Sequence, residues 1–417
     1  MKIHCRFGRF TRRAFALTAA VFALAASALA QPEWLDQVSD SLHVQSASGA
    51  FRGDLSGLLD LEGYYLDQRP PGLIFSPDQF FFNPRLSLFL DVHLGRHFYS
   101  FVQTRCDRGF DPGVKAHDAR FDEYLLRYTP FDDARLNLQA GKFATVVGNW
   151  VRRHDSWNNP LITAPLPYEN VLPITDQKVP LGPIDFLKRQ NVPDKKRDWL
   201  PLLWGPSYAS GASVFGQAAG FDYAVELKNA AISSRPSAWD GEALNWEHPT
   251  VSGRLAYSPN PTWNLGASAS YGAYLLPTAA AVLPAGRALG DFRQLTVAED
   301  VTFAWRHWQV WGEAFASRFD VPNVGPVETL AYYVETKYKL TANLFAAARW
   351  NQQLFDTIPN GVGGEQPWDR DMTRVDLALG YRFSRHLQTK MQYSYGHRRG
   401  EPQQGEQLAA AQLTVKF

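Results

Sequence analysis

Apolar and polar residues alternate along most of this chain, and this period of two constrains its fold more than any other feature. In the segment 51–66, Leu59 and Leu61 fall on one parity. Asp60 and Glu62 fall on the other. Because successive side chains of a β-strand point to opposite faces, such a segment predicts a strand with one apolar and one polar face.

About sixteen segments alternate in this way, and the connections between them alternate in length. The short connections fall at 95–96, 130–133, 218, 259–261, 306, 341 and 384–385. Short turns at one end, long loops at the other and strands of about ten residues predict an all-β fold, a transmembrane antiparallel β-barrel. The predicted strands are 51–66, 83–94, 97–107, 119–129, 134–143, 206–217, 219–230, 250–258, 262–275, 292–305, 307–319, 327–340, 342–354, 370–383, 386–397 and 407–417.

A soluble all-β sandwich or propeller also alternates, but two features favour the membrane barrel. The chain ends inside a predicted strand on Phe417, which resembles the assembly signal of bacterial outer-membrane barrels. Aromatic residues also gather where strands meet turns, as expected of girdles at the membrane interfaces. These residues are Phe98, Tyr128, Trp305, Trp308, Tyr338, Tyr381 and Phe383.

The first residues, 1–30, are predicted to be a cleaved signal peptide. A basic start that includes Arg12 and Arg13 precedes a largely apolar run at 14–26 and a small-x-small cleavage site at 28–30. That run is shorter than the about 20 residues that a membrane-spanning helix needs. The paired arginines also fit a twin-arginine signal, although we favour an ordinary export signal. Residues 31–50 are predicted to be a periplasmic lead-in with a short helix at 32–42.

Composition limits the partners of the chain. The 42 basic and 41 acidic residues nearly balance, which gives no support for nucleic acid as a partner. Cys5 lies in the predicted signal peptide, so Cys106 has no intramolecular partner for a disulfide. An exported chain of this size without disulfides needs a large core or a closed sheet. No zinc-spacing, haem-attachment or glycine-rich phosphate motif occurs, so we expect no metal and no cofactor.

The longest connection runs from Gly141 to Gly205, roughly 60 residues without alternation. Prolines are dense in this connection and exclude helix and sheet interior. A loop of this length inside a compact fold is more often functional than filler.

With its signal peptide, strand count, terminal Phe417 and long loop between the fifth and sixth strands, the chain resembles the sixteen-stranded outer-membrane porins. The resemblance is architectural and covers the whole predicted mature chain, residues 31–417, and no short motif identifies a subfamily. It implies that 144–205 is the third outer loop, folded into the lumen where it narrows the channel. The length of this loop also leaves room for a plug or a lid.

Strand register predicts which charges face the lumen. Around the turn at 95–96, Arg85 and Arg105 fall nearly opposite each other, and around 130–133, Arg127 and Arg135 pair nearer the periplasm. These arginines resemble the basic wall that faces the constriction loop in porins, but each of them could instead pair with a nearby acid. The predicted pore-lining residues are Arg85, Arg105, Arg127, Arg135, Asp91, Glu123, Arg349, Arg374 and Asp376.

The predicted constriction loop contributes both charges and aromatic rings. Its candidate residues are Arg152, Arg153, Asp155, Trp157, Asn158, Glu169 and Asp176. The tryptophans of the loop could stack on sugar rings, but we favour the interpretation that they anchor the loop to the barrel wall. They are Trp150, Trp157, Trp199 and Trp204.

Glu299 breaks the pattern of its strand, because it shares the apolar parity with Val297 and Val301. A carboxylate that faces lipid near mid-membrane is costly. A β-bulge at Glu299 and Asp300 would turn both acids inward. Alternatively, Glu299 lies in a contact between subunits.

The leading hypothesis is a non-enzymatic porin in the bacterial outer membrane, a passive diffusion channel for small hydrophilic solutes, because lumen-facing acids and bases nearly balance. One alternative is a saccharide-preferring channel, and another is a barrel that sheathes a partner such as a cytochrome. His154, Asp155 and Ser156 are adjacent in sequence and do not have the arrangement of a triad.

The expected partners are outer-membrane lipid, small solutes and further copies of the chain. Porins of this size commonly trimerise, so the resemblance implies a homotrimer. Small outward residues permit close approach of neighbouring walls, and strands 51–66 and 407–417 carry four of them side by side across the seam. They are Gly57, Gly63, Ala409 and Ala411.

Overall fold

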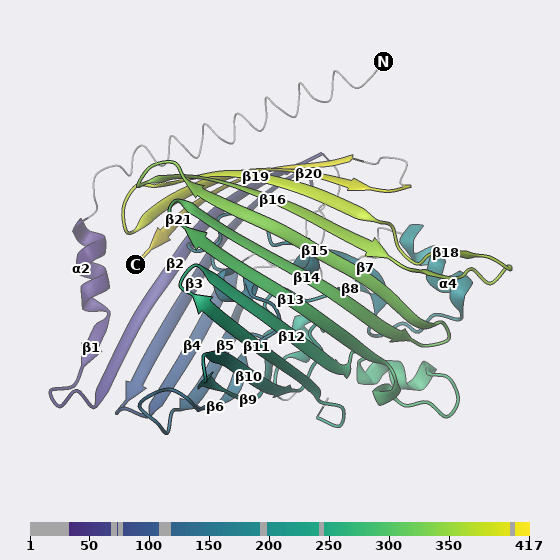
Figure 1. The fold of residues 1–417 in the computed structure, drawn as a ribbon, viewed down its shortest axis with the longest axis horizontal. Coiled ribbons are helices and arrows are strands. Elements are labelled where there is room, and N and C mark those ends of the chain that lie inside the picture. The colour runs from purple at the N-terminus through teal and green to yellow at the C-terminus, as the bar shows by residue number, and fades with distance from the viewer. Residues whose placement is uncertain are drawn as a thin grey trace, which may run out of the picture.

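A computed structural model describes residues 33–67, 73, 78–107, 118–191, 198–241, 246–400 and 405–417. Within this part of the chain, sixteen antiparallel strands pair in sequence order and close into one barrel (Figure 1). The predicted all-β barrel is confirmed, and each predicted strand is present within a few residues of its expected bounds. The predicted signal peptide at 1–30 lies outside the described residues.

Short turns join the strands at one end of the barrel, here called the turn end, and longer connections join them at the other, the loop end. The turn between β5 and β6 covers 129–136 and is longer than expected. The barrel strands are β2 (Phe51–Leu66), β3 (Phe80–Leu94), β4 (Phe98–Asp107), β5 (Asp118–Tyr128), β6 (Asn137–Phe143), β9 (Ala209–Ala218), β10 (Phe221–Lys228), β11 (Thr250–Asn260), β12 (Trp263–Ala273), β13 (Arg293–Trp305), β14 (Trp308–Val321), β15 (Gly325–Lys339), β16 (Leu344–Phe355), β19 (Met372–Arg382), β20 (Leu387–Arg398) and β21 (Gly405–Lys416).

Short elements occupy the connections at the loop end. The long connection between β6 and β9 contains η1 (Trp150–Arg153), α3 (Leu166–Glu169), β7 (Val171–Thr175), α4 (Pro183–Lys188), η2 (Arg189–Asn191) and β8 (Trp199–Pro201). The other connections contain η4 (Pro236–Ala238), η5 (Pro277–Val282), η6 (Leu289–Asp291), β17 (Thr357–Pro359) and β18 (Glu365–Pro367).

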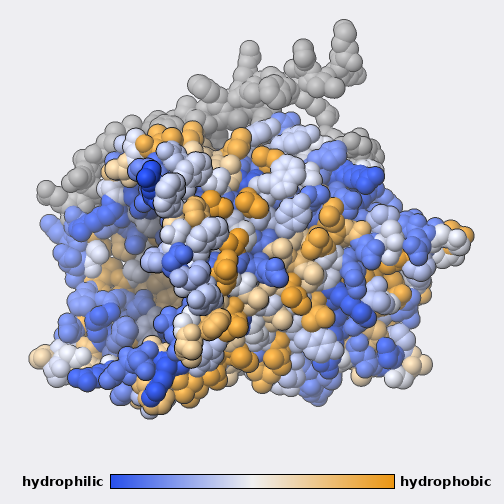
Figure 2. All heavy atoms as spheres, viewed as in Figure 1, coloured by the Kyte–Doolittle hydropathy of each residue, from blue (hydrophilic) through white to orange (hydrophobic). Residues whose placement is uncertain are grey.

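The two faces of each strand differ as the alternation predicts. On β15, the outward side chains of Leu330 and Val334 are 44% and 52% exposed, whereas the inward Tyr333 and Glu335 are buried. Figure 2 shows hydrophobic residues over the outside of the strands and hydrophilic residues toward the two ends. An apolar outer band with a polar interior is the arrangement that lipid requires of a barrel.

The barrel closes where β21 pairs with β2, from Leu58↔Lys416 to Leu66↔Leu408. Beyond this ladder, Phe417 exchanges two backbone hydrogen bonds with Gly57, of 2.9 and 3.1 Å. A Cβ atom at Gly57 would lie 2.4 Å from the Phe417 ring. Gly57 is therefore covered by the terminal ring and is not a free small residue on the outer wall.

The lead-in folds onto the turn end of this seam. It forms α2 (Glu33–Ser41), close to the predicted helix, and β1 (His43–Gln45), which pairs with β2 at Arg52–Asp54. Asp36 of α2 accepts a hydrogen bond of 2.7 Å from Arg385 Nε in the turn between β19 and β20. Among the helices in the described part of the chain, none has both the length and the apolar character to cross a membrane.

Of the two interpretations of Glu299 that the sequence left open, the bulge is excluded, because β13 pairs with β12 and β14 in unbroken register there. Asp300 points inward and binds Arg254 Nη2 at 2.7 Å. Glu299 points outward between Ala267 and Ala314 and is exposed. The ion pair between Asp300 and Arg254 stabilises this register of β13, in which Glu299 lies on the apolar face.

The seam generates a prediction about assembly. We expect Phe417→Asp and Gly57→Val to reduce the yield of folded barrel severalfold, because both changes disrupt the packing of the terminal ring on Gly57. Gly253→Val is the matched control, since the Cβ of residue 253 would lie 3.5 Å from its nearest neighbour. Folded fractions are measured by the electrophoretic mobility of unheated against heated samples. Equal yields for Phe417→Asp and the unchanged chain would contradict the terminal-strand assignment.

Candidate functional site in the barrel lumen

The long connection between β6 and β9, here called the internal loop (144–205), lies against the inward faces of β13–β20. Figure 1 shows its strands β7 and β8 behind the front strands of the barrel. It enters at Gly148, whose φ of +78° is in the left-handed region. A Cβ atom there would lie 2.1 Å from the Tyr168 hydroxyl, so only glycine fits this entry point.

Glu313 on β14 fixes the first turn of the internal loop. Its carboxylate accepts hydrogen bonds from the backbone N–H groups of Asn149 and Trp150, at 2.7 and 2.5 Å. The hydroxyl of Tyr168 donates a further bond of 2.5 Å to the same carboxylate. A carboxylate at the start of a helical turn offsets the unpaired N–H groups there, so Glu313 both positions and caps η1.

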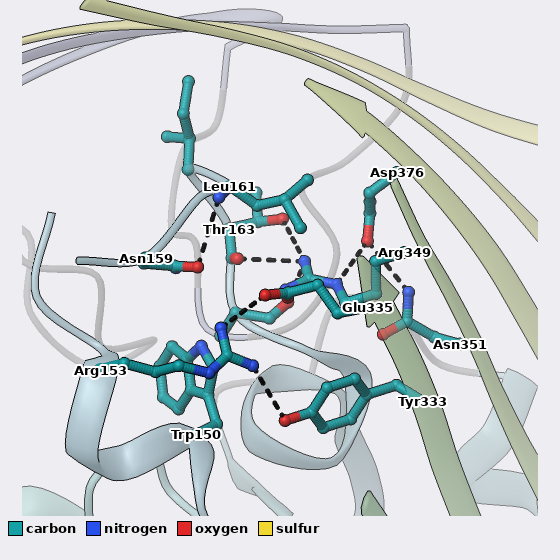
Figure 3. Close-up of polar contacts among 12 residues, drawn as sticks. Trp150, Arg153, Asn159, Leu161, Thr163, Tyr333, Glu335, Arg349, Asn351 and Asp376 are labelled. Carbon is teal, nitrogen blue, oxygen red and sulfur yellow. Dashed lines mark hydrogen bonds and ion pairs between the residues drawn. The ribbon is translucent and has the colours of Figure 1, made fainter. Parts of the chain in front are cut away.

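Arg349 on β16 is the central anchor of the loop (Figure 3), and its side chain has no exposed surface. It donates to Asp376 at 2.9 Å and to Glu335 at 3.1 Å. Its remaining nitrogen, Nη2, donates to the carbonyl oxygens of Thr163 and Ala164, at 3.0 and 2.9 Å. The guanidinium therefore joins two barrel carboxylates to the backbone of the loop.

Three further cations join the loop to the same wall. Arg153 of the loop donates to Glu335 at 2.5 Å. Arg374 of β19 pairs with Glu169 of the loop. Lys390 of β20 donates to three loop carbonyls, at 2.7, 2.9 and 3.3 Å. Each of these charges is buried and paired or hydrogen-bonded, as buried charges must be.

An apolar cluster fills the space between the loop and the barrel toward the loop end. It contains aromatic residues of the internal loop, of the strands and of the connection between β18 and β19, among them Trp150, Tyr168, Trp199, Trp204, Phe315, Phe319 and Trp368. Three of the four loop tryptophans are thus packed in this cluster. Trp157 is the exception and is half-buried beside the open part of the lumen.

An open cavity of about 680 Å³ remains between the loop and the opposite wall, β2–β5. Its acidic lining residues are Asp60, Asp91, Glu123 and Asp155. Its basic lining residues are Arg85, Arg105, Arg152 and Lys416. His154 also lines it, but burial lowers the pKa of His154, so the imidazole adds no charge at neutral pH. The cavity lining is therefore balanced in formal charge.

The predicted arginines of this wall are paired with acids. Arg85 binds Asp60 at 3.0 Å and Glu62 at 2.7 Å on the neighbouring strand. Arg105 lies opposite Ser87, two residues from Arg85, and binds Asp122 at 2.8 Å. Both arginines face the cavity, but their charges are largely offset.

Arg127 and Arg135 do not pair, contrary to the prediction. Arg127 lies opposite Gln139 and donates to its side-chain oxygen at 2.9 Å. Arg135 lies in the exposed turn before β6, with its guanidinium 4.0 Å from the centre of the Phe131 ring. The prediction failed because the turn is longer than expected, which moves Arg135 out of the strand.

Arg349, Arg374 and Asp376 face inward as predicted, but they lie beneath the loop and do not line the open cavity. Three predicted loop residues are likewise turned away from it. Arg153 and Glu169 bind the barrel wall, and Asp176 binds Arg235 at 2.6 Å. The loop residues that do line the cavity are Arg152, Asp155, Trp157 and Asn158, together with the predicted wall residues Asp91 and Glu123.

Sequence reasoning missed three anchors, Glu313, Glu335 and Lys390. Each stands on the inward parity of its strand, so alternation alone indicates that it faces the lumen. The pairing of each with the loop is a contact between residues more than 140 positions apart, and no local pattern encodes it.

Comparison with known proteins agrees with this architecture. No protein-family model and no curated protein matches the chain. The anion-selective porin of Comamonas acidovorans superposes with a TM-score of 0.57 at 9% identity, covering 88% of this chain and all of that one. OmpF of Salmonella typhi, in complex with daunomycin, gives 0.55 at 12% identity over 90% of this chain and all of that one. The channel DcaP of Acinetobacter baumannii gives 0.53 at 10% identity over 90% of this chain and 99% of that one.

These likenesses, with the closed barrel of sixteen strands, define the class of fold. The chain has the fold of the outer-membrane porins.

The anchor generates a prediction about the internal loop. Replacing Arg349 with Met leaves Glu335 and Asp376 with fewer partners in a buried site, at a cost of about 3–5 kcal/mol. We expect the barrel to persist while the loop detaches, so that protease cleaves within 144–205 faster and single-channel conductance rises. Arg318→Met is the matched control, because Arg318 is 48% exposed and pairs with Asp320. An unchanged cleavage pattern and conductance for Arg349→Met would contradict the anchoring role.

Proposed function

We propose that this chain is a porin of the bacterial outer membrane, a passive diffusion channel for small hydrophilic solutes. The observation that carries this proposal is the position of the internal loop. The loop is fixed to one wall of the barrel and leaves an open polar cavity along the other. A loop held in this way narrows the lumen without contributing to closure of the sheet.

The charge distribution supports weak ion selectivity. The cavity is lined by equal numbers of acidic and basic residues, so no single sign of charge dominates its field. A channel with a balanced lining admits both anions and cations of suitable size. Solute choice then depends on the width of the cavity and on local contacts.

A saccharide-preferring channel is the second candidate, and it rests on Trp157. Its ring is half-buried beside the cavity, where a sugar ring could stack. However, Arg382 lies 4.6 Å and Lys416 5.7 Å from the centre of the same ring. These cations compete for the ring, which makes the saccharide channel the weaker candidate.

Two other hypotheses find less support. A barrel that sheathes a cytochrome needs an empty lumen, whereas the internal loop fills much of this one.

A catalytic triad at residues 154–156 is also unsupported. The ring nitrogens of His154 contact Val151 O and the Tyr208 hydroxyl, at 2.5 and 2.6 Å. Asp155 instead accepts backbone hydrogen bonds from Trp157 and Asn158, each of 2.9 Å.

Single-channel recording in planar bilayers tests the proposed function. We expect a conductance that rises with salt concentration and a reversal potential near zero in a salt gradient. The double variant Arg85→Gln and Arg105→Gln removes two positive charges and leaves the acids, so it shifts permeability toward cations.

The matched control for the charge variant is Arg85→Gln with Asp60→Asn, which removes one charge of each sign and leaves the reversal potential unchanged. Folding of every variant is checked by its electrophoretic mobility. The proposal is overturned if the folded barrel does not conduct. A saturating current block by glucose or maltose supports the saccharide channel instead.

A homotrimer is the proposed assembly. Ala409 on β21 is a partly exposed small residue on the outward face, whereas Gly63 on β2 and Ala411 on β21, which lie opposite each other, are buried within the chain. Small outward residues let neighbouring walls approach closely. We expect the mass in mild detergent to be that of three chains, and Ala409→Trp to lower it. Ala269→Trp on β12 is the control and leaves the mass unchanged. A monomeric mass for the unchanged chain excludes the trimer.

A further inference from the structure

Two phenylalanines stand on the inward, otherwise polar face of the open wall. Phe89 on β3 and Phe101 on β4 both line the cavity, and both are half-buried. Their ring centres are 6.3 Å apart and their planes differ by 18°, so the rings form a stacked pair. Polar residues precede and follow them on the same face, with Ser87 and Asp91 on β3 and Gln103 on β4.

The aromatic pair lies outside the apolar clusters of the barrel interior. Among the described residues, neither ring belongs to the apolar cluster beneath the loop or to the smaller apolar clusters. Partly exposed aromatic surface in a water-filled lumen is unfavourable unless something covers it. An aromatic or flat apolar solute would cover it with offset stacking at ring distances of about 4.5–7 Å.

The acidic residues of the cavity are already hydrogen-bonded. Asp91 accepts a bond of 2.5 Å from the Tyr99 hydroxyl. Glu123 accepts one of 3.0 Å from the Ala144 backbone N–H. Asp155 accepts two backbone bonds of 2.9 Å. Asp60 is paired with Arg85. The acids of the cavity therefore have reduced capacity to bind a cationic solute.

Two of the basic residues, in contrast, keep their donors available. Arg152 on the loop is exposed, and in the described part of the chain its side chain has no ion pair. Lys416 is also exposed and contacts the Trp157 ring without an acidic partner among the described residues. Although formal charges balance, the donors available to a solute are cationic.

We infer that the cavity contains a binding subsite for small aromatic carboxylates, with the solute ring against Phe89 and Phe101 and its carboxylate bound by Arg152. An arginine fork suits a carboxylate, because two parallel N–H donors match its two oxygens. A cavity of about 680 Å³ has ample room for one such solute beside water. This inference rests on the proposed channel function and names a class of solute for it.

Benzoate is the probe for this subsite. We expect benzoate added to the recording buffer to reduce the single-channel current in a saturating manner. Acetate, which has the charge without the ring, and benzyl alcohol, which has the ring without the charge, do not saturate in the same range. The variant Arg152→Gln and the double variant Phe89→Ser with Phe101→Ser each weaken the apparent affinity for benzoate about tenfold or more, whereas Arg152→Lys retains part of it.

A matched control comes from the turn between β5 and β6, where Arg135 lies over Phe131 outside the cavity. Arg135→Gln and Phe131→Ser leave benzoate block unchanged. Saturation-transfer NMR of benzoate with the detergent-solubilised barrel measures binding independently of conduction. It also tests any variant whose channels do not insert.

The outcomes separate the two proposals. A conducting barrel without saturating benzoate block or NMR binding overturns the subsite and leaves the channel function intact. Block by glucose or maltose in place of benzoate overturns the subsite in favour of a saccharide channel. A folded barrel that does not conduct overturns the proposed channel itself. Equal benzoate affinity for the Arg152→Gln and unchanged barrels excludes Arg152 as the carboxylate ligand.

Discussion

A guanidinium without exposed surface determines how the interior of this barrel is arranged. Removing Arg349 from water is costly, and mutual attraction within a buried ion pair offsets this cost only when the hydrogen-bond geometry is good and the remaining donors are satisfied. Barrel carboxylates satisfy part of the guanidinium, but Nη2 has its partners on the backbone of the internal loop. Wall and loop therefore depend on each other.

This dependence divides the lumen into two unlike halves. The wall from β13 to β20 presents Glu313, Glu335, Arg374 and Lys390, whose hydrogen-bonding capacity the loop takes up. The wall from β2 to β5 satisfies most of its charges within itself, as the pairing of Arg85 with Asp60 and Glu62 illustrates. Among the described acids that line the open cavity on this second wall, only Glu123 accepts a hydrogen bond from the loop, at the Ala144 N–H, and the open cavity lies on the side of this wall.

Much of the fold could be predicted from the sequence, because strand alternation and turn position are local properties of the chain. Asp60 and Glu62 were assigned to the inward face by parity alone, and they lie there. The candidate site was harder to predict than the fold, since parity indicates that Arg349 and Asp376 face inward but not that a distant loop covers them. Arg135 shows a second limit, because the predicted strand begins at 134 and β6 begins at Asn137, and this boundary error of three residues moves the side chain from the wall to a turn.

Glu299 shows a third limit of the same reasoning. The cost of a carboxylate on the apolar face made a bulge one of two interpretations, yet the neighbouring Asp300 forms its ion pair with Arg254 in a strand that stays regular. Adjacent side chains of a strand point to opposite faces, so only one of the two acids can face inward. Asp300, which has an ion-pair partner, is the one that does. This outcome depends on β11, more than 40 residues away in the sequence, so it is invisible in the pattern of β13 alone.

The lead-in has a mechanical consequence for the barrel. β1 lies on the part of β2 that β21 does not reach, and α2 crosses to the turn between β19 and β20, where Asp36 contacts both Arg385 and His386. The lead-in therefore connects β2, on one side of the seam, to the turn between β19 and β20, on the other side. Separation of β2 from β21 therefore requires the contacts of the lead-in to break, as well as the backbone hydrogen bonds between the two strands. Such a contact raises the barrier to opening and so lengthens the lifetime of the closed barrel, independently of what passes through it.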